Sequence, residues 1–288
     1  MKKQPLLLTF FYLGAAGFIQ AQPKVTTIPF EYQKGVPYVQ VVSTGKQLHP
    51  LRFILDTGAS PTVFNHAITS SMNLERYAQN GICGDSPAMY VHQVHATCGG
   101  ISLNHVALAT SLTDISFGCG HWVDGLLGTD YFRNKIVTVD FKGHTLEIQE
   151  PESKSMVAAL VDGIPFCDRH DSVFVTIQTP QSNRPLVFLL DTGSTRTFID
   201  SKLAKNMGLG LAVKGQQVRT VGGKTVAFEA NDFVGTCKGH ALPSKIYTSD
   251  FSDLSWRYTK RIDGILGTDF LQAFKVHIDF QTREVQFN

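Results

Sequence analysis

The sequence predicts an all-β protein made of two similar lobes in one chain, with a few short helices. The first observation is a repeat: the apolar stretch ending in Asp-Thr-Gly at residues 53–60 returns 135 positions later, at residues 188–195. The second is a delayed companion, at residues 124–130 and 263–269, which begins 68 and 72 residues after the first aspartate of each copy. The third is a series of short strand-like segments between Gly and Pro turns, with little helical periodicity. A long repeat with matched parts indicates two copies of one structural unit.

The N-terminus is basic and then apolar. Lys2 and Lys3 precede an apolar run of 14 residues at 6–19, which is too short for a comfortable membrane span. This pattern predicts a secretory signal peptide over residues 1–21, cut near Ala21, with an uncleaved N-terminal anchor as the alternative. We therefore expect an exported protein, periplasmic or secreted, with no membrane span after signal removal.

The charge balance argues against some classes of partner. Removal of Lys2 and Lys3 takes the formal net charge from +2 to 0, and the remaining charges are evenly mixed. Such a chain offers no electrostatic attraction for nucleic acid or for an acidic membrane surface.

The five cysteines allow more than one arrangement. Export permits disulfides, but an odd number leaves at least one thiol without a partner in its own chain. Cys98 and Cys237 occupy matching places in the two repeats, so they belong to different lobes and are poor partners for each other. A Cys83–Cys98 disulfide and buried free thiols are both compatible with the sequence.

Each repeat is predicted to follow the same order of elements. An alternating strand, at residues 38–42 and 173–177, leads through a polar hairpin into the Asp-Thr-Gly strand. A short helix is expected after each Asp-Thr-Gly, at residues 66–72 and 201–207. Either Asp200 or Ser201 is suited to cap the second of these helices.

Each repeat is predicted to close with a brief helix near Asp130 or Asp269, followed by a pair of strands. These elements divide the chain into four parts, which are the signal peptide at 1–21, an N-terminal lobe at 22–150, a linker at 151–163 and a C-terminal lobe at 164–288.

The middle of each repeat contains a hairpin positioned to overhang the Asp-Thr-Gly turns. In the second repeat, residues 218–228 form the pattern of a hairpin with a turn at Gly222 and Gly223, 31 residues after Asp191. The same offset in the first repeat falls in the loop between Gly84 and Tyr90. Both hairpins are candidate flaps.

Two Asp-Thr-Gly sequences, each followed by an apolar-apolar-Gly motif, resemble the pepsin and retropepsin group of aspartic peptidases, and within it the bacterial exported members. The resemblance covers nearly all of residues 28–288. It implies two pseudo-symmetric retropepsin-like β-barrel lobes fused in one chain, active as a monomer. It also implies an aspartic-type endopeptidase that needs no metal or organic cofactor and binds a peptide or protein substrate as an extended strand between the lobes.

The resemblance makes Asp56 and Asp191 the catalytic dyad. Two carboxyl groups at hydrogen-bond distance cannot both ionise easily, so they share one proton. The charged member removes a proton from a water molecule that attacks the peptide carbonyl, and the protonated member donates to the carbonyl oxygen. The supporting residues are Thr57 and Thr192, with hydroxyls bonded across the lobes, Gly58 and Gly193, which donate N–H groups, and Gly128 and Gly267, in the loop behind each aspartate.

The two copies differ three residues after the aspartate, where Ala59 corresponds to Ser194. In the family a hydroxyl at this place can donate to the nearby carboxylate, which would lower the pKa. We therefore expect Asp191 to hold the charge and Asp56 the proton, and activity to extend toward near-neutral pH.

The other repeated carboxylates are interpreted as structural, because each lies at a turn or a helix start, where Asp makes local hydrogen bonds. They are Asp124, Asp130, Asp140, Asp263, Asp269 and Asp279. The His92-x-x-His95-x-x-Cys98 pattern is a poor zinc site, because this spacing in a strand places the two histidines on opposite faces. The main alternative function is a catalytically silent, exported peptide-binding or inhibitor-like protein with the same fold.

Overall fold

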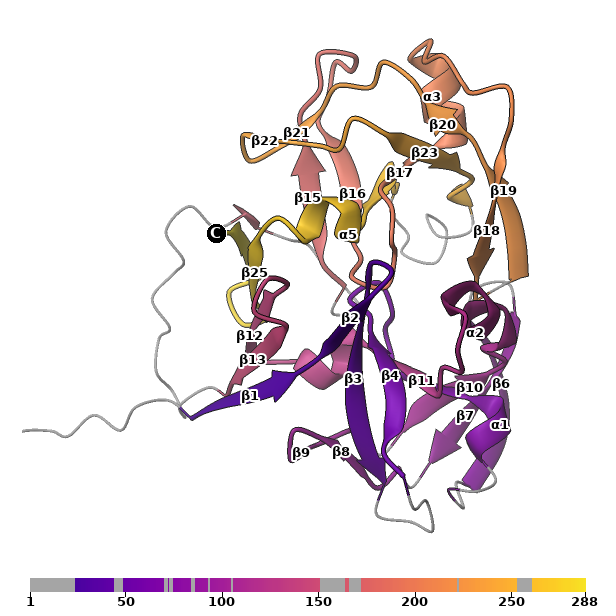
Figure 1. The fold of residues 1–288 in the computed structure, drawn as a ribbon, viewed down its shortest axis with the longest axis vertical. Helices are drawn as coiled ribbons and strands as arrows, with labels where there is room; N and C mark the ends of the chain where they lie inside the picture. Colours follow the sequence, from indigo (N-terminus) through magenta and orange to yellow (C-terminus); the bar gives the residue numbers. More distant parts are fainter. Residues whose placement is uncertain are drawn as a thin grey trace, which may run out of the picture.

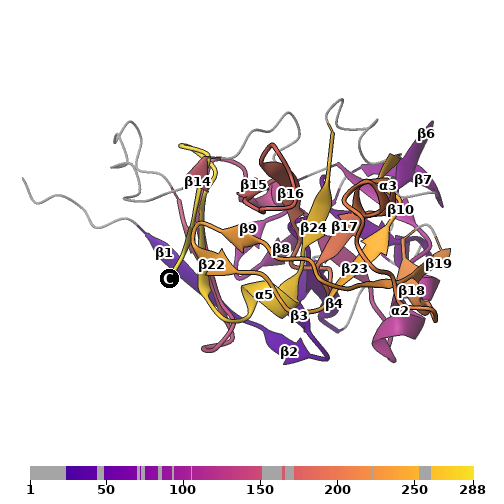
Figure 2. The same cartoon turned by 90° about the horizontal axis from the view of Figure 1, so that it is seen from above.

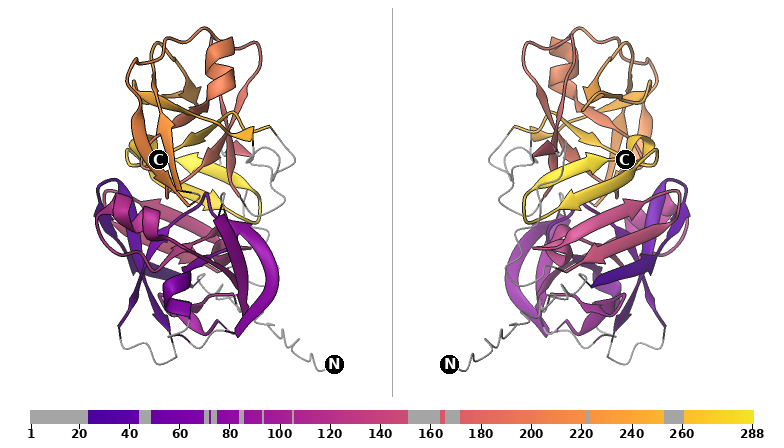
Figure 3. Two further views of the ribbon diagram at one scale, coloured as in Figure 1. Left: turned by 90° about the vertical axis from the view of Figure 1, so that its right-hand side faces the viewer. Right: turned by 90° about the vertical axis from the view of Figure 1, so that its left-hand side faces the viewer.

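The computed structural model describes residues 24–43, 49–69, 72, 75–83, 86–92, 94–104, 106–150, 164–165, 172–221, 223–252 and 261–288, with backbone only for 75–83, 86–92 and 164–165. The predicted signal peptide at 1–21 and linker at 151–163 lie outside these residues. The described chain forms two β-rich lobes stacked one above the other (Figures 1 and 3). Within it, no helix is both long enough and apolar enough to cross a membrane.

The N-terminal lobe is built on one curled sheet of ten strands. In spatial order they are β6 (Glu75–Cys83), β7 (Ser86–His92), β10 (Ala107–Thr110), β5 (Val63–Asn65), β11 (Gly125–Leu127), β4 (Leu51–Leu55), β3 (Val36–Ser43), β8 (Ala96–Cys98) and β9 (Ile101–Ser102), with β2 (Glu31–Gln33) paired to β3. The helices are α1 (His66–Thr69), α2 (Thr113–Cys119) and the 3-10 helix η1 (Thr129–Phe132).

The C-terminal lobe repeats this plan with fewer strands in its main sheet. The order is β15 (Phe174–Ile177), β16 (Leu186–Leu190), β24 (Gly264–Leu266), β17 (Phe198–Asp200), β23 (Ile246–Ser249) and β20 (Glu229–Ala230). Two separate hairpins are β18 (Gln216–Thr220) with β19 (Gly223–Ala227), and β21 (Thr236–Cys237) with β22 (His240–Ala241). The described helices are α3 (Ser201–Asn206) and α5 (Thr268–Leu271).

A third sheet joins the lobes. Its six strands are β1 (Val25–Pro29), β13 (Thr145–Gln149), β12 (Ile136–Asp140), β25 (Lys275–Asp279), β26 (Glu284–Phe287) and β14 (Ile164–Pro165). At its centre β12 pairs antiparallel with β25, and Thr138 lies opposite His277. The main hydrophobic core runs without a break from one lobe into the other beneath this sheet.

The companion motif forms a strand that inserts beside the Asp-Thr-Gly strand. β11 runs parallel to β4 and antiparallel to β5, and β24 is placed likewise between β16 and β17. A Cβ at Gly125 would lie 2.1 Å from the ring of Phe53, and one at Gly264 would lie 2.4 Å from the ring of Phe188. The first glycine of each companion motif therefore makes room for the phenylalanine of its strand.

The all-β fold with two similar lobes is confirmed, and so are the short helices after each Asp-Thr-Gly. Asp200 caps α3, since its carboxylate accepts a hydrogen bond from the N–H of Leu203 at 2.9 Å. The Cys83–Cys98 disulfide is wrong, because Cys98 carries a free thiol, as does Cys237. Both lie in the core, where burial raises the pKa of each thiol to about 12.

Candidate active site

The two Asp-Thr-Gly turns lie at the ends of β4 and β16 and have the same local geometry. The Oδ1 atom of Asp56 accepts hydrogen bonds from the N–H groups of Gly58 and Ala59, at 2.9 and 3.0 Å. The Oδ1 atom of Asp191 accepts the matching pair from residues 193 and 194, at 2.8 and 3.1 Å. Each turn therefore fixes its own carboxylate through two backbone donors.

The threonines of the two turns form a closed set of hydrogen bonds across the lobes. The N–H of Thr57 donates to the hydroxyl of Thr192, and the N–H of Thr192 donates to the hydroxyl of Thr57, both at 3.0 Å. Each hydroxyl then donates to a carbonyl of the opposite lobe, Leu190 at 2.9 Å and Leu55 at 2.6 Å. Both threonines are buried, at 1% and 0% exposure, so these bonds form away from water.

The glycines allow each carboxylate to approach the opposite turn. A Cβ at Gly58 would lie 2.5 Å from the carboxyl carbon of Asp191, and a Cβ at Gly193 would lie 2.6 Å from that of Asp56. The obstacle in each case is the carboxyl group itself, which two hydrogen bonds hold in place. Any side chain at Gly58 or Gly193 would therefore separate the two aspartates.

The two carboxyl groups are linked by a hydrogen bond and act as one titrating pair. Burial, and then the neighbouring charge of Asp191, raises the pKa of Asp56 well above its usual value. Burial also raises the pKa of Asp191, but the hydrogen bond from Asp56 and the backbone N–H groups oppose this rise. Each carboxylate accepts the same two backbone hydrogen bonds, and the raised pKa values favour one proton shared by the pair.

A backbone loop supports each turn from behind. A Cβ at Gly128 would lie 2.8 Å from the backbone of residues 61 and 62, and one at Gly267 would lie 2.3 Å from the carbonyl oxygen of Arg196. The N–H of Gly128 donates to the hydroxyl of Thr62 at 3.1 Å, and that of Gly267 to the hydroxyl of Thr197 at 3.2 Å. The second glycine of each companion motif is therefore packed directly against its turn.

Two threonines that the sequence interpretation overlooked complete this support. The hydroxyl and N–H of Thr62 donate to Asp130 at 2.7 and 2.8 Å, and those of Thr197 donate to Asp269 at the same distances. Each threonine stands six residues after its aspartate, so the repeat itself contained the signal that identifies the pair.

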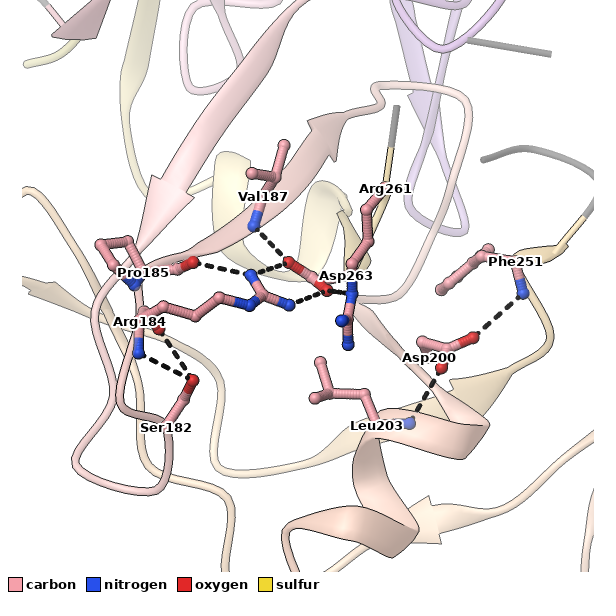
Figure 4. Close-up of polar contacts among 9 residues, drawn as sticks. All are labelled: Ser182, Arg184, Pro185, Val187, Asp200, Leu203, Phe251, Arg261 and Asp263. Carbon is pink, nitrogen blue, oxygen red and sulfur yellow. Dashed lines mark hydrogen bonds and ion pairs between the residues drawn. The ribbon is translucent and has the colours of Figure 1, made fainter. Parts of the chain in front are cut away.

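The first aspartate of each companion motif is structural, as expected, and each binds a distant residue as well as the residue two positions before it. Asp124 accepts hydrogen bonds from the N–H of Arg52 at 2.8 Å and from the indole of Trp122 at 2.9 Å. In the other lobe Arg184 binds Asp263 with two nitrogens at 2.7 Å, and Arg261 adds a third bond at 2.8 Å (Figure 4). Each aspartate therefore binds its motif to the start of the Asp-Thr-Gly strand, through the N–H of Arg52 or of Val187.

The ionised state of Asp263 depends on this arginine clamp. Burial alone would raise the pKa of Asp263, but the hydrogen bonds from Arg184 and from the N–H of Val187 hold the pKa below its usual value. The sequence did not identify Arg184, because nothing in its immediate surroundings marks it as a partner 79 residues before Asp263.

The predicted role of the Ser194 hydroxyl is wrong. This hydroxyl donates to the carbonyl of Arg196 at 2.8 Å, so its one hydrogen is not available to the carboxylate of Asp191. The expected charge on Asp191 therefore has no support from this hydroxyl and stays a prediction.

Replacement of Ser194 by alanine is consequently expected to leave the acidic limb of the pH–rate profile where it is. The backbone N–H that binds Asp191 remains in the variant, and the lost side-chain bond involves only a carbonyl. The profile of kcat/KM against pH, measured for both proteins on one peptide, checks this. An upward shift in the variant would show that the hydroxyl does reach the carboxylate in solution.

The candidate flap residues are described only in part. The second hairpin exists as β18 and β19, but Gly223 pairs with Thr220 as the first residue of β19, with a φ of 126°, so it is not a turn residue. Gly84 and Gly222 lie outside the described residues, and Tyr90 is described by its backbone in β7. In the described part of the chain, no three His, Cys, Asp or Glu side chains gather as metal ligands.

Comparison with known proteins adds one match. A family model described as aspartyl protease matches the chain twice, over residues 39–131 and again over residues 175–270. The two matched segments contain the two Asp-Thr-Gly turns and their companion motifs, and together they cover more than half of the chain. No protein with a curated description gives a significant match.

Proposed function

This chain belongs to the aspartyl protease family, and from that premise we propose that it is an aspartic endopeptidase with Asp56 and Asp191 as its dyad. The observation that carries the proposal is the pair of half-buried, hydrogen-bonded carboxyl groups held by the threonine bonds across the lobes. A hydrolase of this type needs one carboxylate and one carboxylic acid at the same moment, and a shared proton supplies both.

In the proposed reaction the two aspartates have different first roles. Asp191, which is charged, removes a proton from a water molecule lying between the carboxyl groups, and the water oxygen attacks the peptide carbonyl. Asp56 donates its proton to the carbonyl oxygen as the tetrahedral intermediate forms. Transfer of a proton to the leaving nitrogen then breaks the C–N bond and returns the pair to its single-proton state.

We propose an extended peptide with apolar side chains near the cleaved bond as the substrate. Side chains alternate along a strand, so Ile54 lies on the same face of its sheet as Asp56, and Leu189 on the same face as Asp191. Around Ile54 this face carries a buried apolar cluster, here called the Asp56-face cluster: Val36, Tyr38, Ile54, Val63, Leu108, Leu112, Val123 and Leu126. In the other lobe the corresponding Asp191-face cluster consists of Phe198, Ala227, Tyr247 and Phe251, beside a smaller group containing Leu189.

We also propose that one chain suffices for activity, since both half-sites lie in it, and that the protein is exported after cleavage near Ala21. Basic residues followed by a short apolar run support export, as argued above. N-terminal sequencing of the protein recovered outside the cytoplasm tests the cleavage site.

Incubation of the chain without residues 1–21 with a mixed peptide library tests the proposed activity. We expect new termini to appear, detected by mass spectrometry, and none to appear with Asp56→Asn, which keeps the size of the side chain but cannot share a proton. Binding of peptides without cleavage by the wild type would refute the enzyme and select the silent peptide-binding protein.

A further inference from the structure

The β18–β19 hairpin belongs to the C-terminal lobe but contacts both lobes. It forms a two-stranded sheet of its own, separate from the main sheet. Val218 packs against the Asp191-face cluster, while Val221, at the end of β18, packs against the Asp56-face cluster. The Asp56-face cluster also contacts Ala59, which belongs to the catalytic turn. One strand of the hairpin therefore reaches from one half-site to the other.

Arg219 fastens this hairpin to helix α2 of the N-terminal lobe. Its guanidinium donates to the carboxylate of Asp114 at 2.8 Å and lies 4.1 Å above the ring of Phe117. A Cβ at Gly118 would lie 3.2 Å from the Arg219 side chain, so the glycine lets the arginine stem lie against the helix. The Arg219 side chain is only 18% exposed, although it joins two surface elements.

The hairpin and the sheet between the lobes lie on opposite sides of the molecule. In Figures 1 and 2, β1 and the sheet between the lobes occupy one side, and β18 meets α2 on the other. The β2–β3 hairpin also contacts the other lobe, where Thr268 donates to the carbonyl of Gly35 at 2.6 Å. At the two sides of the molecule the lobes are connected by β12 with β25 and by Arg219 with α2. Together with the bonded turns between them, these two connections close a ring.

We propose that Arg219 is the positioning residue that fastens the β18–β19 hairpin, the candidate flap and here called the strap, to α2 and so keeps it closed beside the dyad. This inference rests on the proposed peptidase function. A linear peptide can pass end first between the closed strap and the dyad. A cyclic chain has no free end, and the interior of a long chain is far from its ends, so neither can enter in this way. Such a chain reaches the dyad only when Arg219 releases α2, so the fastening determines which polypeptides are cleaved.

A designed disulfide tests the strap. The position of a Cβ at Gly118 is 3.5 Å from the Cβ of Arg219, which is within the range of disulfides. The variant Gly118→Cys with Arg219→Cys, in a Cys119→Ser background, is expected to form this bond on oxidation. The Cys119→Ser protein alone is the control, and mass spectrometry verifies the bond.

The oxidised variant should cleave a linear peptide but lose cleavage of the head-to-tail cyclic peptide of the same sequence, and reductant should restore it. Cleavage of the cyclic peptide at equal rates in the oxidised and reduced forms would overturn the proposal. So would failure of the disulfide to form, because the hairpin would then not lie on α2.

A second set of variants weakens the fastening without a crosslink. An ion pair near the surface together with a cation–π contact corresponds to a shift of about tenfold in the opening equilibrium. Arg219→Ala should therefore raise kcat/KM for the cyclic peptide about tenfold relative to the linear one, with Arg219→Lys between it and the wild type. The swap Arg219→Asp with Asp114→Arg should return the ratio toward the wild-type value.

Arg52→Ala is the matched control, because Arg52 makes the same two kinds of contact within one lobe, to Glu31 at 2.8 Å and to the ring of Tyr38 at 4.3 Å. It should leave the ratio of cyclic to linear cleavage unchanged. An unchanged ratio in Arg219→Ala would overturn the strap while leaving the peptidase intact. If the wild type cleaves neither peptide, the proposed function fails, and the disulfide alone then decides whether the hairpin lies on α2.

Discussion

Replacement of Asp56 by asparagine is expected to abolish proteolysis and, at neutral pH, to make the protein more stable. General acid–base groups of this kind contribute roughly 10²–10⁴-fold to the rate, and the dyad cannot work with one member, so kcat should fall at least that far. The gain in stability follows from the pKa of Asp56, which burial and Asp191 raise well above its usual value. At neutral pH both carboxyl groups ionise readily in the unfolded state, but ionisation of both is costly in the folded state. The wild-type pair therefore lowers the free energy of unfolding.

The direction of the pH effect follows from this raised pKa. The folded state binds the Asp56 proton more tightly than the unfolded state, so the group stabilises the fold at low pH. That contribution is lost as the pH rises from the ordinary carboxyl range through the raised pKa of the folded state. The melting temperature of the wild type should therefore decline over this range relative to that of Asp56→Asn, as measured by thermal unfolding in matched buffers.

Asp250→Asn provides a control with the opposite sign. Hydrogen bonds from Ser252 hold the pKa of Asp250 below its usual value, so its loss should cost a little stability at neutral pH and leave activity unchanged. If Asp56→Asn and the wild type show parallel melting curves against pH, the carboxyl groups are not buried together in solution.

Replacement of Thr57 by valine should have the second largest effect, on both stability and activity. Valine has nearly the same shape, but it leaves the N–H of Thr192 and the carbonyl of Leu190 without their partner in a buried place. Each such group costs about 1–3 kcal/mol, so we expect a loss of about 2–5 kcal/mol in the free energy of unfolding. Activity should fall as well, because these bonds set the spacing of the two carboxyl groups.

A double-mutant cycle separates this shared network from two independent losses. Thr57→Val and Thr192→Val remove bonds from one closed set, so the double variant should lose clearly less stability than the two single losses together. Thr248→Val, at a buried threonine whose bond stays within one lobe, is the control for a simple loss of a hydroxyl. Denaturant unfolding of the wild type and the four variants measures these free energies, and strict additivity would contradict the network.

The sequence predicted those features that occur in both copies of the repeat. It predicted the two β-rich lobes and both Asp-Thr-Gly turns, because apolar alternation and Asp-Thr-Gly are local patterns that depend on few neighbours. It also identified the glycines of the companion motifs, although the reason for Gly125, the ring of Phe53, required the strand order. Because these glycines recur at matching positions in the two copies, they can be recognised even when the residues that they contact are unknown.

The features that the sequence did not predict depend on contacts between distant residues or on a choice between hydrogen-bond partners. Arg184 reaches Asp263 across 79 residues, and Arg219 reaches Asp114 across 105 residues, and neither has a counterpart in the other repeat. The hydroxyl of Ser194 could have donated to the carboxylate of Asp191 or to the carbonyl of Arg196. Only the folded structure shows that the acceptor is the carbonyl. The spacing of the cysteines allowed a disulfide between Cys83 and Cys98. In the structure Cys98 is a free thiol in the core, and its carbonyl accepts a hydrogen bond from the hydroxyl of Tyr131.

The sheet between the lobes can form only after both halves of the chain have been synthesised. Thr138 and His277 face each other in its central pair although 139 residues separate them, and the two Asp-Thr-Gly turns are 135 residues apart. Contacts of such long range form late, and a ribosome delivers the N-terminal half first. Until β25 is synthesised, β12 remains an open strand edge, which is prone to pair with other chains. A nascent chain that holds only the first lobe therefore has an unpaired strand edge, and the pairing of the second lobe with the first both covers this edge and brings the two Asp-Thr-Gly turns together.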